Sequence, residues 1–401
     1  MSADPRRRIV LEAERLRSRR GRGARAFELR VEELALCAGE VLVILGPNGS
    51  GKSSLLRALA GVDPILGEGG VRHHGSGTVG LVFQRPAALS GSVWHNVRAA
   101  LLGRRMSRRE RRDRVRSALD RFEIGELAGH DARTLSGGEL RRLALARAFV
   151  VEPEVLLLDE PFDDLDAEGQ RSLSLDLQRA IAETGVAVAV VTHDLRRALL
   201  LADRIAVLEG GRLAQVGSRD EVLLRPLTPQ VARRVGMLNV IVGEVVRREA
   251  DVAWVGIGPG LEVPAVSSYP VGASVWVGIR PEHLEVGVGG GTGLEIGPAR
   301  IESLVSDGLV TVATLRMSSH VLTTHFLAGR GLARRLTVGD RVSLEIDPAK
   351  VQIRPSERTG GPGHSGGGPE RTGVSAQESR AEVRAEEPAR RRAPDDRGQL
   401  A

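Results

Sequence analysis

The segment GPNGSGKS, residues 46–53, constrains the fold more than any other part of the sequence. It fits the pattern G-x-x-x-x-G-K-[ST], directly follows the apolar run Val41–Leu45 and precedes a helical segment at 54–60. In such a strand–loop–helix unit, glycines let backbone N–H groups converge on phosphate oxygens, and the helix dipole adds to the attraction. The sequence therefore predicts a phosphate-binding loop within an α/β domain.

The side chains of this loop predict what it binds. Lys52 is expected to reach the β- and γ-phosphates of ATP, and the Ser53 hydroxyl is expected to bind Mg²⁺. Only two of the 57 Lys and Arg residues are lysines, Lys52 and Lys350, so a lysine at this position is unusual for the chain. The residues expected to contact ATP are Gly46, Pro47, Asn48, Gly49, Ser50, Gly51, Lys52, Ser53 and Ser54.

Two adjacent carboxylates follow a second apolar run in the segment VLLLDEP, residues 155–161. The run predicts a buried strand, and in a parallel sheet the carboxyl end of a strand faces the ligand crevice. Asp159 is expected to hold Mg²⁺, while Glu160 orients or deprotonates the attacking water.

The segment LSGGE, residues 135–139, lies between these motifs and opens a helical run at 140–148. Ser-Gly-Gly at a helix start is a second anion-binding geometry, since it offers N–H groups, a hydroxyl and a positive dipole end. One chain does not need two such phosphate sites, so we interpret this segment as completing the site of a second subunit.

Three regions of the chain differ in composition and in the pattern of their apolar residues. In residues 1–235, β-branched runs alternate with helical stretches, which favours a largely parallel sheet. Residues 236–354 contain short strand-like runs separated by Gly and Pro, which indicates a small β-barrel or sandwich. Residues 355–401 are rich in Gly, Glu and Arg and contain few large aliphatic side chains, so we expect a disordered tail.

Taken in order, GPNGSGKS, Gln84, LSGGE, VLLLDEP and His193 resemble the nucleotide-binding subunit of an ABC transporter. The resemblance implies a P-loop NTPase fold with a helical subdomain, and a head-to-tail dimer that sandwiches two ATP molecules. Each phosphate loop would face a set of residues from the other subunit: Ser136, Gly137, Gly138 and Glu139.

The same resemblance implies roles for isolated residues. Gln84 matches the Q-loop glutamine that contacts ATP-bound Mg²⁺, so the implied metal ligands are Ser53, Gln84 and Asp159. His193 matches the catalytic histidine that contacts the γ-phosphate, and Asp166 matches the D-loop aspartate.

Three positions depart from the family pattern. Where an aromatic side chain usually stacks on adenine the chain has Arg20, and Phe27 is the alternative. A planar guanidinium can also stack, so both remain candidates. Asp163 stands where the D-loop usually has Ser, and Glu139 replaces the commoner Gln of the signature.

The segment VGIRPEHLEV, residues 277–286, resembles the accessory OB-like β-barrel, or TOBE domain, of importer ATPases, and 238–246 resembles its entry. Residues 83–97 and 325–346 resemble the molybdate and tungstate importers. Iron, polyamine and sugar importers use similar barrels, so those cargoes are the alternative hypothesis. The barrel itself is expected to stabilise the dimer or to bind a regulatory ligand.

Several observations bear on location and partners. No apolar run approaches the ~20 residues that span a bilayer, and the N-terminus lacks the apolar core of a signal peptide. The single cysteine, Cys37, cannot form an internal disulfide. We therefore expect a soluble cytoplasmic chain. The resemblance to importer ATPases implies a peripheral subunit on the cytoplasmic face of the cell membrane, working with transmembrane permease subunits and an extracytoplasmic solute-binding protein.

The net charge of +6 raises the alternative of an ABC ATPase that acts on nucleic acid. That class predicts a long coiled coil between the motifs or two ATPase domains in one chain, and the sequence has neither, so no nucleic-acid partner is expected. The Arg-rich segment 104–116 has two interpretations: a solvated helical face, or a contact with lipid headgroups or an acidic partner.

Overall fold

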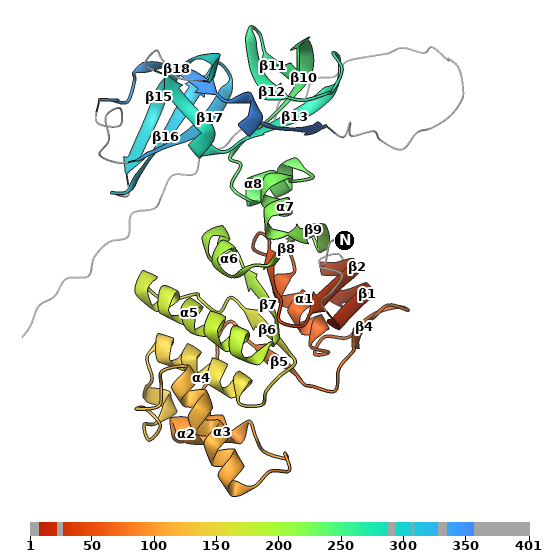
Figure 1. Cartoon of the computed structure of the whole chain (residues 1–401), viewed down its shortest axis with the longest axis vertical. Helices are drawn as coiled ribbons and strands as arrows, with labels where there is room; N and C mark the ends of the chain where they lie inside the picture. Colours follow the sequence, from red (N-terminus) through yellow and green to blue (C-terminus); the bar gives the residue numbers. More distant parts are fainter. Residues whose placement is uncertain (1–7, 22–26, 288–292, 307, 328–334, 357–401) are drawn as a thin grey trace, which may run out of the picture. The chain divides into compact units, whose positions relative to one another are not determined.

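A computed structural model describes residues 8–21, 27–287, 293–306, 308–327 and 335–356 (Figure 1). The tail expected from residue 355 lies outside these ranges except for its first two residues. Pro355 is the last residue of strand β19 (Gln352–Pro355).

The N-terminal region forms a nine-stranded sheet in the order β4-β1-β2-β9-β8-β3-β7-β6-β5. Its five consecutive parallel strands are β8 (Arg204–Glu209), β3 (Val41–Leu45), β7 (Ala187–Thr192), β6 (Val155–Asp159) and β5 (Val79–Val82). The apolar runs at 41–45 and 155–158 coincide with β3 and β6, to within one residue at each end. The α/β fold class is therefore confirmed.

An antiparallel extension completes the sheet and was not predicted. It consists of β1 (Ile9–Arg20), β2 (Phe27–Cys37), β4 (Gly70–His73) and β9 (Arg212–Ser218). Strand β1 pairs antiparallel with β2 and β4, while β9 pairs antiparallel with β8. Strands β2 and β9 pair in parallel. The expectation of a largely parallel sheet thus holds for the five consecutive strands and for this pair, and not for the pairs β4–β1, β1–β2 and β9–β8.

Alternate residues of β3 serve two separate cores, because side chains of a strand point to opposite faces in turn. Leu42 and Ile44 pack in a cluster with helix α1 (Lys52–Leu59). Val41, Val43 and Leu45 belong to the cluster that includes α4 (Gly137–Phe149) and α5 (Ala167–Thr184). This two-sided burial fixes the end of β3, from which the phosphate loop leaves.

Three helices form a separate group: α2 (Val93–Ala99), α3 (Arg108–Arg121) and α4. They contact one another (Figure 1), and each has a serine N-cap whose hydroxyl accepts a backbone N–H: Ser92, Ser107 and Ser136. This is the expected helical subdomain. The helices that follow are α6 (Leu195–Leu201), α7 (Arg219–Leu224) and α8 (Pro229–Arg234).

The C-terminal region forms two five-stranded antiparallel sheets that share one apolar core. One has the order β12-β11-β10-β13-β19 and the other β14-β18-β15-β16-β17. The strands are β10 (Asn239–Glu249), β11 (Val252–Gly258), β12 (Leu261–Val266), β13 (Ser274–Ile279), β14 (Leu284–Gly287), β15 (Leu294–Ser306), β16 (Val310–Met317), β17 (His320–Leu327) and β18 (Arg341–Ile346). Across the described ranges, no helix is both long and apolar enough to cross a membrane.

Candidate functional site

The phosphate loop joins β3 to α1 and is organised around Lys52. The Lys52 ammonium donates to the carbonyl oxygens of Gly46 at 3.0 Å and Pro47 at 3.2 Å, and it lies 3.9 Å from Glu160 Oε1. Burial lowers the pKa of Lys52, while the charges of Glu160 and Asp159 act in the opposite direction. The cation is therefore held inside the loop with its charge directed at the carboxylates of β6.

At two positions of the loop, neighbouring atoms leave no room for a side chain, so only glycine fits. Gly51 has φ +101°, and a Cβ there would lie 2.5 Å from Cζ of Phe27. A Cβ on Gly46 would lie 2.4 Å from the carbonyl oxygen of Leu208. Real Cβ atoms do not approach other heavy atoms this closely, so the loop packs against β2 and β8 only with glycine at both positions.

The two carboxylates at the end of β6 face the loop. Ser53 Oγ donates to Asp159 Oδ1 at 3.0 Å. Burial raises the pKa of Asp159, and the hydrogen bond from Ser53 and the charge of Lys52 oppose that rise. The next residue, Glu160, has φ +45°, a left-handed conformation that non-glycine residues adopt at a cost of about 1–3 kcal/mol. Its backbone N–H donates to Val191 O at 3.0 Å, which helps to hold this geometry.

Glu160 and His193 lie in contact across the ends of β6 and β7. The distance from His193 Nδ1 to Glu160 Oε1 is 3.1 Å. Asp163 completes a group of three whose potential ligand atoms all lie within 4.8 Å of one another. Gln84 Nε2 donates to Asp163 Oδ2 at 3.1 Å. Asp163 is one of the three residues that depart from the family pattern, and the sequence did not predict its contact with Gln84.

A cavity of about 600 Å³ lies over the loop and reaches Glu160. Both candidates for adenine contact, Arg20 and Phe27, line this cavity. The other lining residues are Gly21, Asn48, Gly49, Gly51, Lys52, Ser53, Ser54, Gln84 and Glu160. The structure therefore keeps both Arg20 and Phe27 as candidates.

The residues expected to act on a second subunit do not line this cavity. Ser136 caps α4, and its backbone N–H donates to Glu139 Oε2 at 2.7 Å. Hydrogen bonds from the Ser136 hydroxyl and backbone lower the pKa of Glu139. Ser136 and Gly137 are exposed, and Gly138 is half-buried. Asp166 caps α5 by accepting a hydrogen bond from Gly169 N at 2.8 Å.

Arg141 is a site residue that the sequence analysis missed. Its guanidinium is buried and donates to the carbonyl oxygens of Gln84 and Glu160, both at 3.2 Å, and to Asp164 Oδ2 at 3.3 Å. The segment LRRLALARA showed only a helical run with several arginines. The available signal was its helical spacing, four and eight residues before the apolar residues Leu145 and Phe149, which are buried on the inward face of α4.

The residues present fit a bound nucleotide and Mg²⁺. Ser50 Oγ and Glu160 Oε2 are buried and lack a hydrogen-bond partner within the described ranges. Buried polar atoms are normally paired, so these two oxygens have capacity for a ligand. A lysine, two hydroxyls and two carboxylates around backbone N–H groups supply the donors and acceptors that a triphosphate and a hard cation require.

A phosphate loop at the end of a parallel strand, with two carboxylates at the end of a neighbouring strand, defines a P-loop ATPase. Residues 29–163 match the ABC transporter family, and residues 277–353 match the TOBE domain.

Curated relatives extend the match over most of the chain. The spermidine/putrescine import ATP-binding protein PotA 1 of Pseudomonas aeruginosa is 33% identical over 81% of this chain and 92% of that protein. The molybdate/tungstate import ATP-binding protein WtpC of Pyrococcus horikoshii is 32% identical over 82% of this chain and 97% of that protein. The sulfate/thiosulfate import ATP-binding protein CysA of Methylococcus capsulatus is 37% identical over 65% and 77%, respectively.

The chain belongs to the ABC transporter family, as an ATP-binding subunit with a C-terminal TOBE domain. It is an ATPase whose cofactors are ATP and Mg²⁺.

Proposed function

We propose that this ATPase powers the import of a solute through separate transmembrane permease subunits. The observation that carries the proposal is the assembly of Lys52, Ser53 and Asp159 with Glu160 and His193 at the carboxyl ends of three parallel strands. The import function of the relatives supports the direction of transport. We further propose that residues 1–235 are the ATPase domain and 236–354 the TOBE domain.

We assign the site residues as follows. Gly46 to Ser54 bind the phosphates of ATP, while Ser53, Gln84 and Asp159 hold Mg²⁺. Bound MgATP supplies the phosphoryl group and the cation that neutralises its charge. Glu160 orients the attacking water and accepts its proton at Oε2, the oxygen without a partner. His193 fixes the other oxygen of Glu160 and faces the γ-phosphate.

The protein acts as a head-to-tail homodimer in this proposal. The exposed start of α4 then completes the site of the partner subunit with Ser136, Gly137, Gly138 and Glu139, and Asp166 lies at the same interface. The absence of these four residues from the cavity lining of their own chain supports this arrangement.

A mixing experiment tests the dimer. Lys52→Ala and Ser136→Ala chains each place a defect in both sites of a homodimer. In a mixed dimer, however, both defects fall in one site and the other site is intact. Random pairing should then restore about a quarter of the wild-type ATPase rate if the sites act independently. No recovery on mixing, with dimers present by light scattering, would exclude the composite site.

We further propose that the subunit lies on the cytoplasmic face of the membrane and that an extracytoplasmic solute-binding protein delivers the cargo. We propose an inorganic oxyanion, molybdate or tungstate, as that cargo. The match to nearly the whole length of the Pyrococcus protein and the similarity of residues 83–97 support it. Residues 328–334 of the second similar segment lie outside the described ranges. Iron, polyamine or sugar import by the same machine is the alternative.

A multi-element profile tests the cargo. Cells lacking this chain are grown with limiting metals and oxyanions, and a strain that carries Glu160→Gln serves as the second comparison. Specific loss of molybdenum or tungsten in both strains is the expected result. Loss of iron instead would reassign the cargo, and an unchanged profile would reject an oxyanion.

A further inference from the structure

A cavity between α2 and α3 has an unusual charge. Its volume is about 690 Å³, and it lies in the helical subdomain, away from the phosphate loop. Its lining consists of one aromatic and five basic side chains: Trp94, Arg98, Arg108, Arg111, Arg112 and Arg116. No carboxylate lines it, so the cavity gathers five positive charges without a counter-ion from its own walls.

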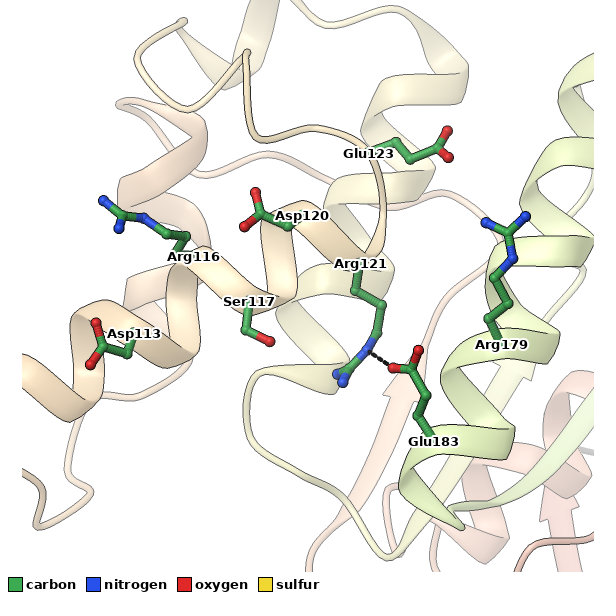
Figure 2. A pocket seen from close by; sticks show the side chains of 8 residues that line it. All are labelled: Asp113, Arg116, Ser117, Asp120, Arg121, Glu123, Arg179 and Glu183. Carbon is green, nitrogen blue, oxygen red and sulfur yellow. Dashed lines mark hydrogen bonds and ion pairs between the residues drawn. The ribbon is translucent and has the colours of Figure 1, made fainter.

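The neighbouring cavity on the same helix shows that this is more than a consequence of an Arg-rich surface. That cavity, between α3 and α5, has a volume of about 510 Å³, and both carboxylates and arginines line it (Figure 2). Its charged lining residues are Asp113, Asp120, Glu123 and Glu183, with Arg116, Arg121 and Arg179. Arg121 pairs with Glu183 there at 3.1 Å, whereas Arg116, which lines both cavities, has no ion pair among the described residues.

The carboxylates of α3 are directed to other arginines. Glu110 pairs with Arg114 at 3.3 Å, and Asp113 lies 3.8 Å from Arg109. Among the residues that the structure describes, no ion pair involves Arg98, Arg108 or Arg112. Arg111 donates through Nη2 to Arg104 O at 3.3 Å, while its Nε is buried without a partner.

The arrangement is unfavourable for the helix itself. Arg108, Arg112 and Arg116 are spaced at i, i+4 and i+8, so they form a row of like charges on one face of α3. Arg108 is also the first residue after the N-cap Ser107, where the positive end of the helix dipole disfavours a cation. Helix stability therefore does not explain these residues, and a bound anion would.

We propose that this cavity binds a multivalent phosphate-bearing anion, either the headgroup of an anionic phospholipid or a free polyphosphate. Guanidinium groups match phosphate oxygens with paired N–H donors, and several of them facing one space favour an anion of more than one charge. The exposed positions of Arg98, Arg108, Arg112 and Arg116 leave the cavity accessible from solvent. The site does not depend on the proposed import function.

Two binding measurements on the full chain separate the sources of phosphate. The first is co-sedimentation with vesicles of phosphatidylcholine containing phosphatidylglycerol, compared with pure phosphatidylcholine. The second is calorimetric titration with inorganic tripolyphosphate. All proteins in the titration carry Lys52→Ala, so that the phosphate loop does not contribute. The test variant is Arg108→Gln/Arg112→Gln, and the matched control is Arg225→Gln/Arg341→Gln, which removes two exposed arginines elsewhere.

We expect the test variant to bind at least one of the two probes about 25-fold more weakly, or about fivefold per arginine, with the control close to the parent chain. A loss with vesicles alone identifies a lipid headgroup, and a loss with tripolyphosphate alone identifies a free polyphosphate. Equal losses in test and control, or no binding of either probe by the parent, would overturn the proposal. The melting temperature of the test variant should be unchanged or higher, since a repulsive row is relieved.

Discussion

His193 Nδ1 lies 3.1 Å from Glu160 Oε1, and the other carboxylate oxygen of Glu160 is buried without a partner in the described structure. One oxygen is therefore occupied by a neighbour and the other has its full capacity to accept a proton. Glu160 has a left-handed backbone conformation with φ +45°, and its Oε1 also lies 3.9 Å from the Lys52 ammonium.

Replacing Glu160 by Gln is expected to lower the ATPase rate at least about 100-fold while leaving ATP binding nearly unchanged. The amide keeps the size of the side chain but cannot accept a proton from water. Steady-state phosphate release and nucleotide titration measure the two quantities. Glu126→Gln, an exposed carboxylate in the helical subdomain, is the control and should retain wild-type turnover. A Glu160→Gln enzyme of normal rate would remove Glu160 from the chemistry.

Replacing Lys52 by Ala is expected to weaken ATP binding by about 1.5–3 kcal/mol, or about ten- to hundredfold, because a charge-assisted contact is lost. The chain provides its own control in Lys350, the other lysine, which is exposed in the C-terminal region. Lys350→Ala should bind ATP as the wild type does. Comparable affinity in the two variants, measured by fluorescence titration, would contradict the assignment of the loop.

Gly51 and Gly49 provide a matched pair for the packing of the loop. Both have positive φ, +101° and +79°, but a Cβ would meet Phe27 only at Gly51, and nothing lies within 4 Å at Gly49. Gly49→Ala should cost about 1 kcal/mol from backbone strain alone. Gly51→Ala should cost about 1–3 kcal/mol more, since Phe27 or the loop must move. Denaturant unfolding gives the two free energies, and equal losses would show that the contact with Phe27 is relieved cheaply.

The ion pair of half-buried Arg142 with buried Asp176 is expected to be important for stability. Arg142 lies 2.7 Å from Asp176 Oδ2 and donates to Phe122 O and Ser172 Oγ, while the Asp176 side chain is 3% exposed. Arg142→Ala leaves that buried carboxylate with only the longer contact to Arg179, at an expected cost of about 3 kcal/mol.

Arg179 is the control for this prediction, since it lies 3.7 Å from the same carboxylate but is 66% exposed. Arg179→Ala should cost less than about 1 kcal/mol. Thermal unfolding of both variants checks the difference, and a stable Arg142→Ala protein would mean that water replaces the guanidinium.

The parallel half of the sheet could be predicted because β3, β6 and β7 are buried on both faces and so read as continuous apolar runs. Strand β1 could not be found by the same signal. Its buried residues Ala13 and Leu16 are three positions apart, since Arg15 adopts a left-handed conformation with φ +45° and interrupts the alternation. The alternation of buried and exposed residues in β1 is thus broken at Arg15, and a search for strict alternation misses the strand.

In the candidate site, too, some residues could be predicted from the sequence and others could not. Motifs at strand ends predicted that Lys52, Ser53, Asp159 and Glu160 would lie together, because parallel strands end at one edge. The place of His193 beside them was implied by the family resemblance. The contact of Gln84 with Asp163 and the buried position of Arg141 depend on how loops and α4 pack, which no local pattern specifies.

Arg141 lies on α4, and its guanidinium connects this helix to two other segments of the ATPase region. It donates to the carbonyl oxygens of Gln84, after β5, and of Glu160, after β6. A swing of α4 relative to the sheet must break or carry along both carbonyl contacts. Motion of the helical subdomain is therefore coupled to the backbone at Gln84 and at Glu160, two residues that line the cavity over the phosphate loop. The hydrogen bond to Glu160 likewise transmits a backbone shift at that residue to α4.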